Sequence, residues 1–554
     1  MIKRIATIVI LGILFITISH AIPNEKAFIR SEKYMVVTNH GLATKAAQQV
    51  LDEGGNAVDA AVTAMFVLGV VEPWASGIGG GGYMMISDPH SYQKVVIDFR
   101  EKAPERAASQ IFYRDKDAFR YNAYIGYRSV CVPGMIAGVS AALDRYGTIT
   151  QSAAVEPAIK IARNGFMVSE RFNTMLWRYY DLIETHKATS VVFMPELVPV
   201  PVDEKMVRDD LAVTLETLAL RDFRDFYMGV IADDIIAEFS RNDGILTNSD
   251  LRSYEINHRE AIKTTYRDYT VFTTPLPSAG GISLAQVLNI LESINIDTTE
   301  HNSGEYIHKI LEACNVAYLD ARKYGRDPDF YPVNVDRYLS DEHMQILASE
   351  IDSFHHSNDE YFNDSKKPRS RNSSPVCVID ESGMAVTVNQ SINFFFGSQV
   401  THPKYGILFN NGLYSFSQDS LSADRIEPGK KAVTNMFSTM IYRSGKPFLL
   451  INSTGELSSV IVVAHVICSI IDFNLDIYEA IDAPRFYEED GFVNLETRID
   501  SEAIEELKRR GHRIKLRTDY NTDFGLTQAI HILPGSEIMH GAADPRGEGI
   551  ADGK

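Results

Sequence analysis

The stretch "NSSPVCVIDESGMAVTVNQSIN" (372–393) decides the fold that this sequence predicts. Two nearly apolar runs, 375–380 and 384–393, flank the residues Glu-Ser-Gly, which favour a turn. We therefore expect a β-hairpin. Because neither strand alternates apolar with polar residues, the hairpin should belong to a sheet that other layers cover on both faces.

The segment before the hairpin, 351–374, is polar and predicts a solvated loop or linker. Its paired histidines, His355 and His356, are too isolated in the sequence to suggest a metal site. The polar segment stops at Asn372, next to Ser373. Ser373 is either a nucleophile that cleavage would free or an ordinary loop serine.

The N-terminal part of the chain predicts helices over 41–53 and from about 58, then strands at 83–88 and 94–99. Between them, "GIGGGGYMMISD" (77–88) contains a GxGxxG pattern. A dinucleotide-binding pattern needs a strand before it and a helix after it. Here the order is reversed, so the glycines indicate close backbone packing or a turn.

Beyond the hairpin, strands are expected within 437–454 and helices within 457–482 and 501–511. Residues 130–330 alternate helical patterns with loops. This order predicts sheets between helical layers, in an α/β or α+β fold. The length of 554 residues suggests two to four domains, or one large sandwich that uses most of the chain.

The composition excludes some function classes. Apolar residues make up 45% of the chain, enough for a substantial core. The net charge of −19 argues against nucleic-acid binding, which normally needs a basic face. The four cysteines are widely spaced without a CxxC pattern, so no zinc site is expected. Disulfides and buried free thiols remain equal alternatives for these residues: Cys131, Cys314, Cys377 and Cys468.

The first 21 residues have the pattern of a signal peptide. Lys3 and Arg4 precede an apolar run over 5–19, and Ser-His-Ala at 19–21 suits signal peptidase. We expect cleavage after Ala21 and a secreted, extracellular protein, with an uncleaved membrane anchor as the alternative.

Glycosylation sequons fit an exported chain. The candidates are Asn363, in a polar loop, and Asn372, whose triplet is followed by a proline. Asn389 and Asn452 also fit the pattern, but they lie in expected strands and are interpreted as chance matches.

Many motifs are shared, in order, with one known family. They are "EGGNAVDAAV" (53–62), "VEPWASGIGGGGYM" (71–84), "DFREKAP" (98–104), "VPGMIAG" (132–138), "PSAGGISL" (277–284), "GILFNNGLYSFS" (406–417), "IEPGKKAV" (426–433) and "GAADPRGEGIADG" (541–553). From about residue 30 to the C-terminus, the chain resembles the γ-glutamyltransferase (glutathione hydrolase) family.

The resemblance implies an α+β fold, the αββα four-layer sandwich of the N-terminal-nucleophile hydrolases. It also implies a precursor that cuts itself into two subunits, here 22–372 and 373–554. In the family, the new N-terminal threonine is the nucleophile, and its own α-amine can act as the base. It takes up a γ-glutamyl group and passes it to water or to an amino acid or peptide. No cofactor or metal is implied.

Part of the family's site is retained by this alignment. The family's Thr-Thr-His start aligns with Ser373, Ser374 and Pro375, so the nucleophile position keeps a hydroxyl. Arg100 matches the arginine that binds the substrate's α-carboxylate, for which a guanidinium is well shaped. Ser391 and Asn393 match a Thr-x-Asn pair near the nucleophile.

Other positions depart from the family. The carboxylate expected to hold the α-ammonium becomes Ser415, and the preceding amide or acid becomes Gly412. The Ser-Ser-Met motif, which also holds the carboxylate, becomes Thr434-Asn435-Met436, and the Gly-Gly oxyanion turn becomes Gly455-Glu456. We expect a glutamate at 456 to fit poorly in a glycine conformation. Its charge should also oppose a developing oxyanion.

The sequence therefore predicts a secreted γ-glutamyltransferase-like protein that is catalytically weak or inactive. Its partner would be a γ-glutamyl compound or glutathione, if binding survives, or an active family relative. The alternative is a working hydrolase or acyltransferase that uses Ser373, with a different acyl substrate. A nucleotide-dependent enzyme is not expected, because the glycine run follows a predicted helix and precedes a predicted strand, the reverse of the order that such enzymes need.

Overall fold

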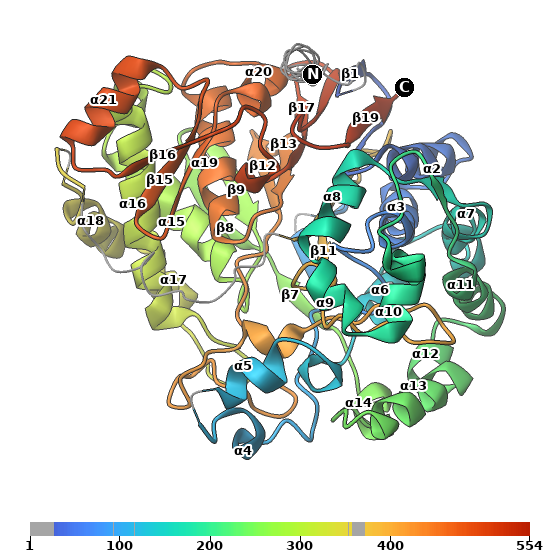
Figure 1. Ribbon diagram of the computed structural model, residues 1–554. Helices are drawn as coiled ribbons and strands as arrows, with labels where there is room; N and C mark the ends of the chain where they lie inside the picture. The colour runs from blue at the N-terminus through green and yellow to red at the C-terminus, as the bar shows by residue number, and fades with distance from the viewer. Residues whose placement is uncertain (1–26, 92–93, 116, 353, 357–371) are drawn as a thin grey trace, which may run out of the picture.

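The computed structural model describes residues 27–554 except 92–93, 116, 353 and 357–371. The expected signal peptide (1–21) and the sequon at Asn363 lie outside the described residues. Two large sheets form the centre of the molecule, and helices lie on their outer sides (Figure 1).

Each large sheet has seven strands, and every neighbouring pair is antiparallel. The first sheet runs in the order β1 (Phe28–Ser31), β18 (Met539–Ala543), β17 (Thr527–Ile532), β13 (Lys446–Ser453), β12 (Thr439–Arg443), β9 (Tyr269–Thr273) and β8 (Ile262–Tyr266). The second runs β19 (Ile550–Gly553), β2 (Met35–Thr38), β10 (Ser374–Ile379), β11 (Ala385–Ser391), β3 (Gly81–Ser87), β4 (Lys94–Asp98) and β7 (Asn257–Glu260).

Strand β10 shows how the layers are built. Its side chains alternate between the two faces of the sheet. Val376 and Val378 pack into the core beneath the helices, whereas Cys377 and Ile379 pack into the core between the sheets. Both faces are buried, which explains why the strand is apolar throughout.

Helices cover both outer faces. Those over the second sheet are α2 (Gly41–Asp52), α3 (Ala57–Val71), α6 (Met135–Tyr146), α7 (Gln151–Asn164), α8 (Glu170–Arg178), α10 (Lys187–Phe193), α11 (Asp209–Arg221), α12 (Asp225–Met228), α13 (Val230–Arg241) and α14 (Asn248–Arg252). Those over the first sheet are α15 (Ala279–Ser293), α16 (Gly304–Tyr324), α18 (Asp341–Ser349), α19 (Leu457–Ile471), α20 (Ile477–Asp482) and α21 (Ser501–Arg509).

Smaller elements complete the described chain. They are helices α4 (Ser109–Phe112), α5 (Ala118–Ala123), α9 (Tyr180–Glu184) and α17 (Val335–Tyr338), the pair β5 (Phe166–Met167) and β6 (Lys205–Met206), and the sheet of β14 (Phe486–Glu489), β15 (Phe492–Glu496) and β16 (Ile514–Arg517). The architecture is the α+β, four-layer αββα sandwich predicted from the sequence. Both large sheets contain strands from before and after Ser373, so the two expected subunit regions share one core.

Most sequence-based expectations for single elements are confirmed. The hairpin forms as β10 and β11, and α2 and α3 lie where helices were expected. The glycine run joins a helix to a strand, and a Cβ on Gly79 would lie 2.2 Å from the carbonyl oxygen of Leu408, so these glycines do allow close backbone packing. The helices expected within 457–482 are α19 and α20. Among the described residues, none of the helices is long and apolar enough to cross a membrane.

Candidate functional site

The Asn372–Ser373 junction is buried at the start of β10, where only 7% of Asn372 and 6% of Ser373 is exposed. The hydroxyl of Ser391, at the end of β11, donates a 2.8 Å hydrogen bond to the carbonyl oxygen of Asn372. The Asn372 amide group donates to the carbonyl oxygens of Trp74 and Phe394. The bond that self-cleavage would break is thus held in a fixed, polar setting.

This burial corrects one prediction. A glycan needs a solvent-exposed asparagine, and the folded chain uses the Asn372 amide internally. Asn372 is therefore a poor acceptor in the folded protein. The sequons at Asn389 and Asn452 lie in β11 and β13 and are buried, as expected for chance matches.

Ser374 contacts an acid that the sequence analysis did not single out. Its hydroxyl donates to Glu72 Oε2 at 2.8 Å and accepts from Ser76 at 3.0 Å. Burial raises the pKa of the Glu72 carboxyl to about 7, although Arg171 and the hydrogen bond from Asn39 oppose the shift. The available signal was an acid directly after α3, whose residues from Ala60 to Val71 are all apolar or small, because only a satisfied or functional carboxyl is expected there.

Asn393 and Ser415 are brought together, as their motifs implied. The Ser415 hydroxyl donates to Asn393 Oδ1 at 2.8 Å, and the Asn393 backbone N–H donates to Ser391 Oγ at 2.8 Å. Since Ser391 in turn binds Asn372, one hydrogen-bonded chain links four candidate residues. Ser415 is half-buried and supplies a hydroxyl where the resemblance predicts a carboxylate.

Gly412 has a tightly packed neighbour. A Cβ at this position would lie 2.9 Å from Cys131 Sγ and 3.0 Å from Asn410 Oδ1. The thiol of Cys131 therefore occupies the space that a side chain at 412 would enter.

All four cysteines lie in the described part of the chain and are free and buried, which decides between the two alternatives left open by the sequence.

Arg100 lies in a buried cluster of charges at the end of β4. Its Nη1 lies 3.1 Å from Glu101 Oε2, and both side chains are almost completely buried. Burial raises the pKa of Glu101, an effect that Arg100 opposes. Behind this pair, Lys431 Nζ lies 2.8 Å from Asp98 Oδ1, and burial lowers the pKa of Lys431 to about 8. Arg100 is thus a buried cation that forms an ion pair with Glu101.

The loop with Thr434 and Asn435 packs on the start of α15. The Thr434 hydroxyl accepts a 3.1 Å hydrogen bond from the Met436 backbone, and the Thr434 carbonyl accepts one from Ala279 at 2.8 Å. Both Thr434 and Asn435 are half-buried. The retained hydroxyl of Thr434 therefore serves the turn of its own loop.

The turn at Gly455 and Glu456 follows β13 and precedes α19. Glu456 has φ 55° and ψ −116°, a conformation that glycine adopts freely and other residues rarely do. Glu456 adopts this conformation all the same, and the fold holds it there at a cost of about 1–3 kcal/mol.

Asn389, interpreted from the sequence as a chance sequon, connects two of these loops. Its amide donates to the carbonyl oxygens of Phe437 and Ser453, each at 3.2 Å. Phe437 follows the Thr434 loop and Ser453 precedes Gly455. Asn389 thus holds both loops against β11, the strand that carries Ser391.

Two groups of histidines and carboxylates in the described residues could hold a metal, and neither includes a candidate-site residue. The site can present hydroxyls and amides around a polarised carbonyl. Groups of this kind can take part in acyl chemistry.

Comparisons with known proteins show which family this chain resembles along its length. The family model for gamma-glutamyltranspeptidase matches residues 43–553. The glutathione hydrolase proenzyme of Escherichia coli K12 is 31% identical over 534 residues, which cover 94% of this chain and 91% of that protein. The acylase ACY 1 proenzyme of Pseudomonas sp. strain V22 is 30% identical over 503 residues, or 88% of each chain.

A solved structure shows the same fold. Cephalosporin acylase from Bacillus halodurans superposes with a TM-score of 0.87 at 26% identity, covering 98% of this chain and 99% of that chain. The sandwich is therefore that of the N-terminal-nucleophile hydrolases. On its motifs, fold and relatives, the chain belongs to the gamma-glutamyltranspeptidase family.

Proposed function

We propose that this chain is an exported γ-glutamyltransferase-like protein with little or no activity toward glutathione and other γ-glutamyl compounds. The observation that carries the proposal is the Ser415–Asn393 hydrogen bond. It places a neutral hydroxyl where the family holds the substrate's α-ammonium with a carboxylate. Losing such a buried charge partner typically costs about 2–5 kcal/mol. That cost corresponds to roughly 30-fold to 5,000-fold in binding.

Two further departures support the same conclusion. Cys131 fills the space beside Gly412, so the amide or acid of the family has no room there. Glu456 brings a carboxylate to the turn that would stabilise the oxyanion, where even the loss of one donor costs about 10²–10³ in turnover. A protein of this kind would act by binding γ-glutamyl compounds or by regulating an active relative.

The test is a direct comparison of turnover. We expect hydrolysis of glutathione and of a chromogenic γ-glutamyl anilide at least about 100-fold slower than by the Escherichia coli relative, at equal enzyme concentration. Equal rates would overturn the proposal.

The second candidate is an acylase that uses Ser373 on a substrate without a free α-amino group. The Ser391 hydrogen bond to the Asn372 carbonyl favours it, because this contact would assist the release of Ser373. Relatives named as acylases also support it. A hydroxyl-directed acylating inhibitor distinguishes the two candidates. If the protein is an acylase, the inhibitor should label Ser373. An inactive protein should not be labelled, and neither should the Ser373→Ala control.

Export is part of the proposal and rests on the N-terminal sequence. N-terminal sequencing of protein from a secreting cell should give a chain that begins near Ile22. A chain that still begins at Met1 and sediments with membranes would show the anchor instead.

A further inference from the structure

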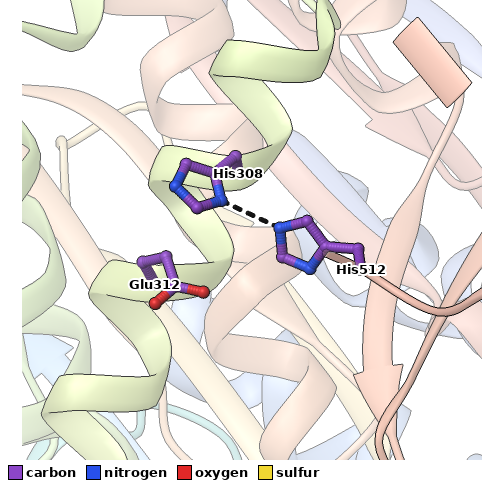
Figure 2. Close-up of side chains that lie close together, drawn as sticks. All are labelled: His308, Glu312 and His512. Carbon is purple, nitrogen blue, oxygen red and sulfur yellow. Dashed lines mark hydrogen bonds between the residues drawn. The ribbon is translucent and has the colours of Figure 1, made fainter. Parts of the chain in front are cut away.

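A cluster of imidazoles and carboxylates lies in the helical layer over the first sheet. Figure 2 shows three of its members, with His308 and Glu312 on α16 facing His512, which lies between α21 and β16. His308 and Glu312 are four residues apart and therefore share one face of the helix. His356 and Glu488, on β14, adjoin them.

The cluster is buried and closely spaced. His308 and Glu312 are completely buried, and only 4% of His512 and of Glu488 is exposed. His308 Nδ1 lies 2.8 Å from His512 Nε2, and His356 Nδ1 lies 2.7 Å from Glu312 Oε1. His356 Nε2 lies 3.6 Å from Glu488 Oε1. Two groups of three residues share His512: His308, Glu312 and His512, and His356, Glu488 and His512. In each group, every residue offers one ligand atom, and these three atoms lie within 4.8 Å of one another.

A backbone carbonyl fixes the tautomer of His308. Its Nε2 lies 2.8 Å from the carbonyl oxygen of Asp352, which can only accept, so Nε2 carries the proton. In the neutral ring, Nδ1 then presents a lone pair to the centre of the cluster. A histidine that binds a metal typically donates its other N–H to a carbonyl or carboxylate in this way.

His512 is not satisfied by the protein alone. Its Nδ1 is buried without a hydrogen-bond partner among the described residues. Leaving one of its nitrogens unpaired costs about 1–3 kcal/mol.

The spacing suits one small cation. Metal–ligand bonds of about 2.0–2.2 Å in a tetrahedral site separate neighbouring ligand atoms by about 3.4 Å. The pairs at 2.8 and 2.7 Å would open by less than about 1 Å to admit an ion, a movement that side-chain rotation supplies. Imidazoles with carboxylates suit Zn²⁺ and similar ions, whereas Ca²⁺ and Mg²⁺ prefer all-oxygen sites.

We propose that this cluster binds one divalent transition-metal ion, with Zn²⁺ as the expected occupant. The ligands would be His308, Glu312 and His512, and the side chains of His356 and Glu488 adjoin them. His308, Glu312 and His512 are all buried side chains, so the ion would be structural. It would tie α16 to the turn after α21, to β14 and to residues 354–356. The sequence suggested no metal site here, because the His355–His356 pair is isolated from other histidines and cysteines in the chain. In the fold, His356 lies next to Glu312 and Glu488.

Metal titration of the purified full chain tests the proposal. After removal of metal with a chelator, Co²⁺ should bind at about one equivalent and give visible absorption typical of a tetrahedral site, and Zn²⁺ should displace it. His512→Gln and Glu312→Gln should each weaken Zn²⁺ binding by at least about tenfold. His355→Gln is the matched control, because that side chain is 76% exposed and adjacent to His356.

Thermal unfolding gives a second readout. Zn²⁺ should raise the Tm of the wild type and of His355→Gln, but not that of His512→Gln. The proposal is overturned if the folded wild type, by circular dichroism, shows neither Co²⁺ absorption nor a Zn²⁺-dependent rise in Tm. It is also overturned if both ligand variants bind Zn²⁺ as tightly as the wild type. The wild-type titration decides the matter even where a variant fails to fold.

Discussion

The Ser391 hydroxyl lies 2.8 Å from the Asn372 carbonyl oxygen and donates a hydrogen bond to it. Self-cleavage would require the Ser373 hydroxyl to attack this same carbonyl carbon, and negative charge would then develop on the oxygen that Ser391 binds. The junction thus keeps one element of the chemistry. Ser415 and Glu456 are among the positions at which the motifs of this chain depart from those of the family.

The first prediction concerns processing of the chain. With Glu456 near the oxyanion turn and Pro375 two residues after the junction, we expect the purified wild type to remain largely one piece on a denaturing gel. Ser373→Thr with Glu456→Gly should increase the cleaved fraction, and adding Ser391→Ala should reverse the gain, since one oxyanion donor is worth about 10²–10³ in rate. A wild type already in two fragments, the smaller beginning at Ser373, would contradict this.

The second prediction concerns the packing of Gly412. Gly412→Gln should destabilise the protein by about 1–3 kcal/mol, because its Cβ would lie 2.9 Å from Cys131 Sγ. Adding Cys131→Ala should recover part of the loss by vacating that space. The shift of the urea midpoint measures both effects. An unchanged midpoint for Gly412→Gln would show that the pocket is open.

The third prediction concerns the strained backbone at Glu456. Glycine usually destabilises a protein, but at φ 55° it should relieve strain of about 1–3 kcal/mol. Glu456→Gly should therefore raise the Tm or leave it unchanged. The control Glu170→Gly, at the first residue of α8, should lose about 0.5–1 kcal/mol. Equal losses in both variants would mean that no strain is stored at 456.

The fourth prediction concerns pH. Burial raises the pKa of Glu72 from the ordinary 4.5 to about 7, so the folded chain holds a proton that the unfolded chain has lost. The resulting stabilisation is complete below about pH 4.5 and is lost as the pH rises through 7. The difference of 2.5 pKa units corresponds to at most about 3 kcal/mol.

Thermal melts between pH 4.5 and 8 check this. Glu72→Gln, which remains neutral throughout, should flatten the decline in Tm with rising pH. Glu53→Gln, an exposed glutamate nearby in the sequence, should leave the decline unchanged. A wild-type Tm that does not fall over this range would contradict the raised pKa.

The layers of the fold could be predicted from the sequence because buried strands and helices have apolar residues in recognisable patterns. The two-sided apolar pattern of β10 and β11 predicted a covered sheet, and the break at 54–56 predicted two helices. The family motifs then brought Ser391, Asn393 and Ser415 to one place, and the structure joins them by hydrogen bonds.

What sequence reasoning missed depends on contacts between distant segments. Glu72 and Ser374 are 302 positions apart, and no local sequence pattern predicts their hydrogen bond. The role of Asn389 as a connector of two loops was hidden for the same reason. His356 was judged by its polar neighbours in the chain, whereas its partners come from a helix and a strand elsewhere. Backbone strain at Glu456 likewise depends on the surrounding fold, which forces the turn.

The most direct measurement of the central claim is restoration of γ-glutamyl hydrolysis. The variant Ser373→Thr, Ser374→Thr, Ser415→Asp, Glu456→Gly returns the two threonines of the nucleophile motif, the ammonium anchor and the oxyanion turn together. Its matched control carries Ser417→Asp instead of Ser415→Asp, which gives the same charge two residues away. Turnover of a chromogenic γ-glutamyl anilide should be near background in the wild type and the control and at least about tenfold higher in the restored variant. A wild type as fast as the restored variant would contradict the claim that this site has lost its recognition of glutamate.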